Sequence, residues 1–266
     1  MRLAFIGGGM MGDAIVSGLL AREVASPADI TIAEVVALRR EHLAATHGIH
    51  VTPDAREAAV GADVVVLAVK PQEFGLAAEA LAGAISGGQT VMSIMAGVTI
   101  NSIVAALKYD AIARAIPNTP AQIGEGMTVW TATPSVTDAG REAVAGVLSV
   151  LGREIYVSDE KYIDMATAVS SSGPAYVFLV MEAMIDAAVH IGLRREMAET
   201  MVLQTVLGSA RYAQATGKTL AELRAQVTSP GGTTTEGLLA LEDAGIRAAF
   251  TKAILAAYEK AKKLGG

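Results

Sequence analysis

The feature that most constrains this chain is a glycine-rich loop within its first twelve residues. Residues 2–7 form a short apolar strand pattern that runs directly into Gly7, Gly9 and Gly12, spaced as G-x-G-x-x-G, and a helical apolar pattern follows. In this context the first glycine permits a tight turn, the second lets the backbone approach a pyrophosphate, and the third packs the helix against the strand. The opening of the chain therefore predicts a dinucleotide-binding βαβ unit.

A second strand is expected at residues 30–33, and it ends at Glu34. An acidic residue about 20 positions after the glycines is the one that hydrogen-bonds a ribose 2′-hydroxyl in this kind of unit. Strand and helix patterns then alternate up to about residue 157. The further expected strands are 49–51, 62–69, 90–94, 111–116, 127–130 and 154–157, and the expected helices are 36–47, 54–60, 72–84, 99–107 and 136–150.

From about residue 159 onward only helical periodicity is present. We expect an α/β fold, with a doubly wound Rossmann-type domain over residues 1–158 and an all-helical substrate-binding and dimerisation domain over residues 159–266. Ligands of doubly wound sheets bind outside the carboxyl ends of the strands. The bends that follow the strands are therefore expected to form one rim for the cofactor, at residues 7–12, 34, 70–71, 95–97 and 117–120.

The composition excludes several classes of function. The chain has 266 residues, a formal net charge of −6 and no cysteine. It has no run of basic residues, so we expect no nucleic-acid partner, and without cysteine there is no disulfide, thiolate metal site or cysteine nucleophile. The four histidines fall at no metal-site spacing, so no metal is expected. The N-terminus enters the glycine loop as a strand, which leaves no signal peptide and favours the cytoplasm.

Residues 175–193 come nearest to a membrane span. Glu182, Asp186 and His190 recur every four positions and form one polar stripe on this otherwise apolar helix. A charge at the centre of a bilayer is costly, so we expect no membrane partner. A helix that is apolar over most of its circumference is buried in a large core or an interface, and here we expect burial between two protomers.

The most distinctive segment of the helical part is Val227–Gly237, in which Gly231 and Gly232 follow a proline and precede three threonines. Adjacent glycines let a ligand approach the backbone, and the helix start after them leaves N–H groups unpaired. The hydroxyls of Thr233–Thr235 can donate and accept hydrogen bonds. The segment suits a small anion with a polar atom beside it, and an ordinary capped turn is the alternative.

No His or Lys lies close to this segment in the sequence. Dehydrogenases that act on alcohols usually need such a general acid–base. Reduction of a C=N bond needs less, because a protonated imine is already electrophilic and positioning supplies most of the acceleration. The pocket therefore points to a small imino acid as the substrate.

Over essentially its whole length the chain resembles the pyrroline-5-carboxylate reductase family. The resemblance is carried by Phe5–Gly12, Leu67–Pro71, Ala96–Thr99, Arg114–Pro120, Ser170–Tyr176 and Leu223–Thr234. It implies reduction of 1-pyrroline-5-carboxylate, a cyclic imino acid, to L-proline with NADPH or NADH, the last step of proline biosynthesis. It also implies a helical domain that interlocks two protomers, and often rings of dimers.

The resemblance also implies the roles of individual residues. Thr234 aligns with the threonine whose hydroxyl meets the ring nitrogen, and is the expected catalytic residue. The expected substrate-binding residues are Ser229, Gly231, Gly232, Thr233, Thr234 and Thr235. The expected cofactor-binding residues are Ile6, Gly7, Gly8, Gly9, Met10, Met11, Gly12, Glu34, Ala68, Val69, Lys70, Pro71, Met95, Ala96 and Asn118, the last of them at the rim near the nicotinamide.

Two positions depart from the family pattern. Ala55 stands where many members carry an asparagine near the adenosine ribose, and Glu34 stands where NADPH-preferring members often have a small hydroxyl residue. A carboxylate repels a 2′-phosphate, whereas Arg39 and Arg40 in the next helix could attract one. We therefore expect NADH to be used at least as well as NADPH.

Two other functions remain open. A hydroxyacid dehydrogenase-like reductase of similar build carries a catalytic lysine on the first long helix of its second domain, and residues 173–193 contain no lysine. A sensor that binds a dinucleotide without turnover is expected to have a degraded substrate loop, whereas residues 227–237 are intact.

Overall fold

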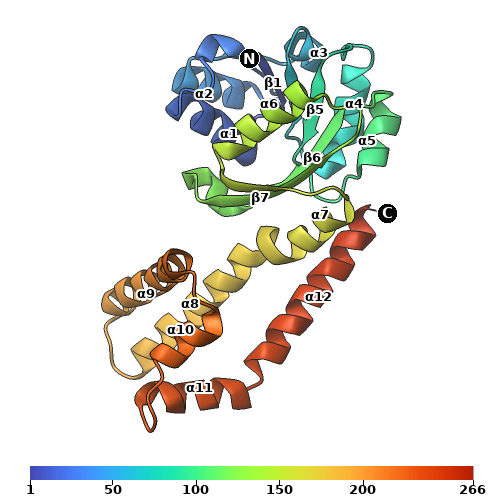
Figure 1. Ribbon diagram of the computed structural model, residues 1–266. Helices are drawn as coiled ribbons and strands as arrows, with labels where there is room; N and C mark the ends of the chain where they lie inside the picture. Colours follow the sequence, from blue (N-terminus) through green and yellow to red (C-terminus); the bar gives the residue numbers. More distant parts are fainter. Residues whose placement is uncertain (266) are drawn as a thin grey trace. The chain divides into compact units, whose positions relative to one another are not determined.

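The computed structural model describes residues 1–265 and divides by its contacts into two units (Figure 1). The first unit comprises residues 1–172 together with the chain from Ala256 onward, and the second comprises residues 173–255. The last strand ends at Tyr156, so the change from strands to helices falls where the sequence places it. The first helical turns after the sheet, up to residue 172, nevertheless belong to the first unit by their contacts.

The first unit is built on an eight-stranded sheet of order β3-β2-β1-β4-β5-β6-β7-β8. Its neighbouring strands are parallel except for the pair β6–β7. In register, Ile6 lies beside both Ala33 and Leu67, so the carboxyl ends of β1, β2 and β4 meet at one edge. The strands are β1 Leu3–Ile6, β2 Ile30–Ala33, β3 His50–Thr52, β4 Val64–Leu67, β5 Thr90–Ser93, β6 Ile112–Ile116, β7 Gly126–Ala132 and β8 Gly152–Tyr156.

Helices cover both faces of this sheet because both faces are apolar. On one face α1, α2 and α6 pack through residues such as Ile15, Leu43 and Val147, and on the other α3, α4 and α5 pack through residues such as Phe74 and Ile103 (Figure 1). The α-helices of this unit are α1 Met10–Ala21, α2 Ala37–His47, α3 Ala55–Ala59, α4 Phe74–Leu81, α5 Ile100–Leu107, α6 Asp138–Ser149 and α7 Lys161–Ala166. The short turns are η1 Pro27–Asp29, η2 Pro71–Glu73, η3 Thr119–Ile123 and the π-helical η4 Thr167–Ser171. The doubly wound architecture is confirmed, with element ends within a few residues of those expected.

Strand β6 places a charged side chain, that of Arg114, in the interior of this unit. The side chain of Arg114 is 1% exposed, and its Nη1 lies 2.5 Å from Glu160 Oε1, just before α7. Its Nη2 lies 3.6 Å from Asp164 Oδ1. The same Glu160 oxygen accepts the backbone N–H of Ile100 at 2.8 Å. One carboxylate thus links β6, α5 and the start of α7.

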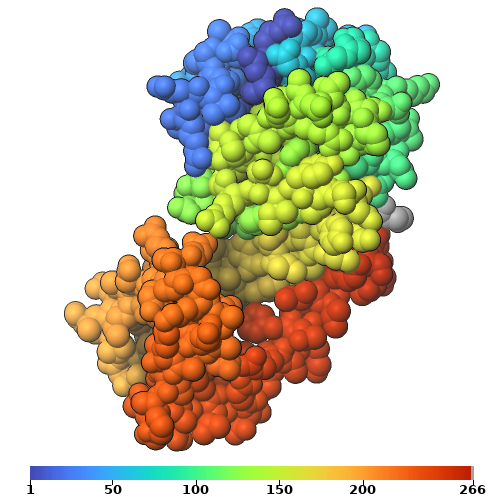
Figure 2. Space-filling view, in the orientation of Figure 1, coloured from blue at the N-terminus to red at the C-terminus, as the bar shows by residue number. Residues whose placement is uncertain are grey.

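The second unit is made of helices only. Its elements are α8 Gly173–His190, α9 Arg195–Thr216, α10 Leu220–Gln226, α11 Thr233–Asp243 and the part of α12 Ile246–Gly265 that precedes Ala256. Helices α8 and α9 pack together. No residue of α8 is buried within the described chain, and the space-filling view shows α9 to α11 uncovered on the face it presents (Figure 2).

Many large apolar side chains of the second unit are exposed. They include Val177, Phe178, Leu179, Met184, Met197, Met201, Leu203, Leu207, Leu239 and Leu241. The continuous helix Lys161–His190 is long and apolar enough to cross a membrane by length and composition alone, and 6% of its most apolar window is buried. An apolar surface of this extent marks an interaction site.

Candidate active site

The glycine loop has the geometry that the sequence predicts. Gly7 has φ +100°, and a Cβ there would lie 2.9 Å from the backbone oxygen of Ala68. A Cβ on Gly12 would lie 2.9 Å from the Gly7 oxygen. A Cβ on Gly9 would meet only Ala68 O, at 3.9 Å, so the backbone of Gly9 faces open space. The first and third glycines are therefore required by close packing, whereas the second leaves room for a ligand.

Helix α1 begins directly at this loop, with Gly9 as its N-cap. Within residues 1–265 the backbone N–H groups of Met10 and Met11 have no hydrogen-bond partner. Unpaired N–H groups and the positive end of the helix dipole favour an anion at this position. The geometry of the loop therefore suits an anion such as a phosphate.

A cavity of about 750 Å³ opens at the carboxyl ends of β1 to β4. Seven of the expected cofactor residues line it: Ile6, Gly7, Gly9, Glu34, Ala68, Val69 and Lys70. Gly8, Met10, Met11, Gly12, Pro71, Met95, Ala96 and Asn118 are not among its lining residues. Arg39 and Ala55, which the sequence connects with the 2′-phosphate and the adenosine ribose, also line it. The lining residues that the sequence does not connect with the cofactor are Ala33, Val35, Val36, Pro53, Asp54, Glu73, Leu76, Ala77 and Ala80. Pro53 and Asp54 directly follow β3, so the rule that ligands bind at strand ends could have found them.

Glu34 is only 9% exposed and is bonded to the backbone through both carboxylate oxygens. Its Oε2 accepts the N–H of Gly8 at 3.0 Å, and its Oε1 accepts the N–H of Val36 at 2.9 Å. The carboxylate therefore fixes the glycine loop as well as placing a negative charge in the cavity.

The two nearby arginines also bond to the backbone of this region. Arg39 donates through Nε to the Gly8 oxygen. Arg40 donates through Nη1 to the carbonyls of Glu34, at 2.7 Å, and Val35, at 2.9 Å. These bonds direct part of each guanidinium toward backbone carbonyls.

The expected cofactor residues that follow β5 and β6 do not line this cavity. Met95 is buried, and its N–H donates to Ser93 Oγ at 3.2 Å. Asn118 lies two residues after the end of the next strand, β6, and both polar atoms of its side chain bond to other backbone segments. The structure thus brings the residues at the ends of β1, β2 and β4 into one cavity and leaves those after β5 and β6 beside it.

The threonine-rich segment forms the start of α11, with Gly232 as the N-cap. Thr235 Oγ1 donates to Ser229 O at 2.6 Å, which closes the turn. Within the described residues, the hydroxyl of Thr234 and the N–H groups of Thr233 and Thr234 have no hydrogen-bond partner. A Cβ on Gly232 would lie 2.5 Å from Ser229 Oγ and 3.1 Å from Ser229 O, so a side chain there would displace the Ser229 hydroxyl. Among the described residues, the segment thus presents two N–H groups and the hydroxyls of Ser229, Thr233 and Thr234 for a ligand.

The other end of α11 is joined to α12. Arg247 Nε lies 2.9 Å from each carboxylate oxygen of Glu242, and this bonding holds the pKa of Glu242 below its ordinary value. The pair bridges the short connection between the two helices and braces the helix that carries the threonines.

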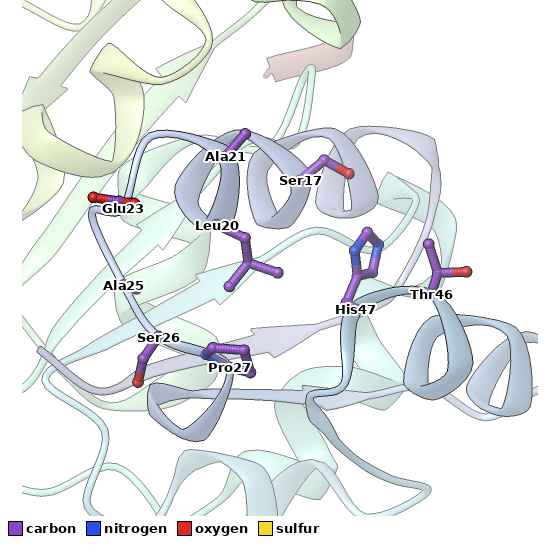
Figure 3. A pocket seen from close by; sticks show the side chains of 9 residues that line it. All are labelled: Ser17, Leu20, Ala21, Glu23, Ala25, Ser26, Pro27, Thr46 and His47. Carbon is purple, nitrogen blue, oxygen red and sulfur yellow. The ribbon is translucent and has the colours of Figure 1, made fainter.

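A second hollow, of about 670 Å³, is lined by parts of α1, α2 and the segment before β2 (Figure 3). The His47 ring lies in it at the end of α2 (Figure 3). Its Nε2 is 2.6 Å from Asp13 Oδ1. None of the expected site residues lines this hollow. Among residues 1–265 no group of three or more His, Cys, Asp or Glu side chains is placed to hold a metal ion.

Two family models match the chain. Residues 160–264 match a model described as pyrroline-5-carboxylate reductase dimerisation. Residues 2–97 match a model described as NADP oxidoreductase, coenzyme F420-dependent. The first covers α7 to α12 and the second covers the glycine loop and the cavity at the strand ends.

Individual proteins resemble the chain over its whole length. A pyrroline-5-carboxylate reductase of Synechocystis is 40% identical over 265 residues, which are 100% of this chain and 98% of that protein. The structure of the Coxiella burnetii pyrroline-5-carboxylate reductase has a TM-score of 0.94 at 39% identity, covering 100% of this chain and 98% of that one. The Plasmodium falciparum pyrroline carboxylate reductase, solved with NADP bound, has a TM-score of 0.89 at 29% identity, with coverages of 100% and 98%.

Proposed function

The chain belongs to the pyrroline-5-carboxylate reductase family, and on that premise we propose that it reduces 1-pyrroline-5-carboxylate to L-proline with NADH or NADPH. The observation in the structure that carries this function is the start of α11, where the Thr234 hydroxyl and two backbone N–H groups are available to one small ligand. The hydroxyacid dehydrogenase and sensor alternatives are not favoured, because the substrate segment is intact and α8 contains no lysine.

The residues of α11 bind and orient the imino acid in this proposal. The N–H groups of Thr233 and Thr234, with the Ser229 hydroxyl, receive the carboxylate at the positive end of the helix. Thr234 Oγ1 accepts a hydrogen bond from the protonated ring nitrogen. A bound nicotinamide would supply the hydride for the new C–H bond, and the C=N electron pair would go to nitrogen. Because the iminium is already electrophilic, positioning accounts for most of the acceleration.

The first unit fits a dinucleotide on its own geometry. The open backbone at Gly9 and the unpaired N–H groups of Met10 and Met11 suit the pyrophosphate. Glu34 stands at the end of β2, where a ribose is held. We propose that the cofactor is held by the strand-end cavity together with the adjoining loops after β4 and β5.

We propose that NADH is used at least as well as NADPH. Glu34, Asp54 and Glu73 line the cavity against Arg39 and Lys70, so acidic groups outnumber basic ones there. A 2′-phosphate brought beside the Glu34 carboxylate adds like-charge repulsion. The family model described as an NADP oxidoreductase and the NADP-bound relative leave the preference between the two cofactors open.

Replacing Glu34 by Ser is expected to raise the kcat/KM for NADPH relative to that for NADH by roughly tenfold, or about 1.4 kcal/mol. The substitution also removes the acceptor for the Gly8 and Val36 N–H groups. Glu34→Gln is therefore the matched variant, since it removes the charge and keeps one acceptor oxygen. The ratio of the two efficiencies should move the same way in both variants. A wild-type protein that prefers NADPH tenfold or more, or a ratio that stays fixed, contradicts the assignment.

The protein self-associates through its helical unit, as the match to the dimerisation model indicates. We propose an interlocked dimer in which the exposed apolar surface of α8 and α9 is covered by a second copy, and rings built from such dimers. If a second copy covers this surface, the apolar helix Lys161–His190 needs no bilayer to shield it from water. We propose that the protein is cytoplasmic. We place the domain boundary at residues 158–159, after β8 and just before the dimerisation match begins at residue 160.

In light scattering the purified protein should have at least twice the mass of one chain and should keep it on dilution. Phe178→Glu, at a position 57% exposed in α8, should weaken the assembly because it buries a charge in the interface. Val60→Glu, at a 69% exposed position in the first unit, is the matched control and should leave the mass unchanged. A wild-type monomer at micromolar concentration contradicts the interlocked arrangement.

A further inference from the structure

Asn118 lies two residues after the end of β6 and bridges two distant backbone segments. Its Oδ1 accepts the N–H of Met127, in β7, at 2.9 Å, and its Nδ2 donates to the carbonyl of Ser170 at 3.0 Å. The orientation of the amide follows from its partners, because a backbone N–H can only donate and a carbonyl can only accept. Both polar atoms of the side chain therefore bond to the protein backbone. An amide side chain is suited to this position because it has one donor group and one acceptor group.

The Ser170 carbonyl lies in the π-helical turn η4, between α7 and α8. The N–H of Ser172 bonds to Thr167 O at 2.9 Å, five residues back, which is the π-helical pattern. Such turns are rare and are frequently found at functional sites. Thr167 Oγ1 and Ser170 Oγ donate to the carbonyls of Ile163 and Ala166, so side chains brace the turn at several points. Among residues 1–265, the bond from Asn118 is the one hydrogen bond that joins this turn to the end of β6.

A separate set of contacts holds the helix before this turn. Arg114 lies in β6, the strand that precedes Asn118. It pairs with Glu160 and lies near Asp164 of α7. Helix α7 therefore remains attached to β6 when the Asn118 bond is lost. A variant at residue 118 should fold, with its effect confined to the turn and to the start of β7.

We infer that Asn118 is a positioning residue: it holds the backbone of Thr167–Ser172 at the carboxyl end of β6, beside the edge of the sheet where the nicotinamide is proposed to lie. This inference rests on the proposed function, since the π-turn then forms a wall of the hydride-transfer site. Asn118 acts through the Ser170 carbonyl, and its loss disturbs the turnover step while leaving the nucleotide-binding cavity at β1 to β4 intact.

The inference is tested with Asn118→Asp and Asn118→Leu in the full-length protein. Aspartate keeps an acceptor for Met127 N–H but turns a second oxygen toward the Ser170 carbonyl, whereas leucine removes both bonds. In hydrogen–deuterium exchange without substrate, the Asp variant should exchange faster over residues 163–176 alone. The Leu variant should exchange faster over residues 163–176 and 126–130. Asn101→Asp, on the exposed face of α5, is the matched control and should match the wild type.

Kinetics separate a positioning role from direct cofactor contact. Asn118→Asp should lower kcat for 1-pyrroline-5-carboxylate about tenfold or more and change the Kd of NADH and NADPH less than twofold. A tenfold rise in cofactor Kd with an unchanged kcat overturns the inference, as does unchanged exchange over residues 163–176, or a lower melting temperature with wild-type kcat. If the wild type itself fails to reduce the imino acid, the proposed function fails, and the exchange patterns still decide whether Asn118 holds the turn.

Discussion

Thr234→Ala is expected to lower the turnover of 1-pyrroline-5-carboxylate roughly 5- to 150-fold, because leaving the ring nitrogen without its hydrogen-bond partner costs about 1–3 kcal/mol. The structure distinguishes this threonine from its neighbour. The hydroxyl of Thr235 is committed to Ser229 O, whereas within residues 1–265 that of Thr234 has no partner. The substitution should therefore weaken the binding of the transition state and leave the affinity for the cofactor unchanged. Steady-state kinetics with saturating cofactor measure the effect.

Two further variants control this experiment. Thr234→Ser keeps the hydroxyl and should retain most of the activity. Thr200→Ala removes an exposed threonine hydroxyl from α9 that bonds only to Glu196 O, and it should leave turnover unchanged. Wild-type kinetics in Thr234→Ala would remove Thr234 from the catalytic role.

Glu160→Ala should lower the free energy of unfolding of the first unit by about 3–5 kcal/mol, because removing one partner leaves the other charge buried and poorly compensated. Arg114 is 1% exposed and cannot release its proton, and without Glu160 its remaining acidic neighbour is Asp164, at 3.6 Å. The Ile100 N–H loses its acceptor in the same variant.

Trp130 reports this unfolding directly, since it is the single tryptophan of the chain and lies in β7 beside β6. Urea unfolding should be followed by its fluorescence at one fixed protein concentration, because association contributes to stability. Glu142→Ala, on an exposed position of α6, is the matched control and should change the free energy by less than about 0.5 kcal/mol. An equal effect of the two variants contradicts a structural role for the Arg114 pair.

The sequence predicts the nucleotide-binding half well, because each part of it is local. A turn at positive φ, a helix start and a strand end are each encoded within a few residues, so Gly7, Gly9, Gly12 and Glu34 lie as expected. The parallel order of the strands then brings these local features together at one edge. The antiparallel direction of β7 has no such local signal, because strand patterns are the same in both directions.

Partners that are distant in the sequence could not be predicted. Nothing in the spacing links Arg114 to Glu160, or Asn118 to Ser170, since the fold alone brings them together. The π-helical turn is equally hidden, because its residues suit an α-helix and the difference lies in which carbonyl each N–H meets. The three adjacent threonines look alike in the sequence, and only the structure shows that Thr235 closes the turn.

The measurement that tests the account most directly is hydride transfer itself. The purified protein is mixed with 1-pyrroline-5-carboxylate and NADH or NADPH that carries deuterium at the transferred position, and the product is analysed by mass spectrometry and NMR. The account predicts L-proline with one deuterium on Cδ, formed in step with cofactor oxidation, and strongly reduced in Thr234→Ala. Cofactor binding with no proline formed, or proline without deuterium at Cδ, would contradict it.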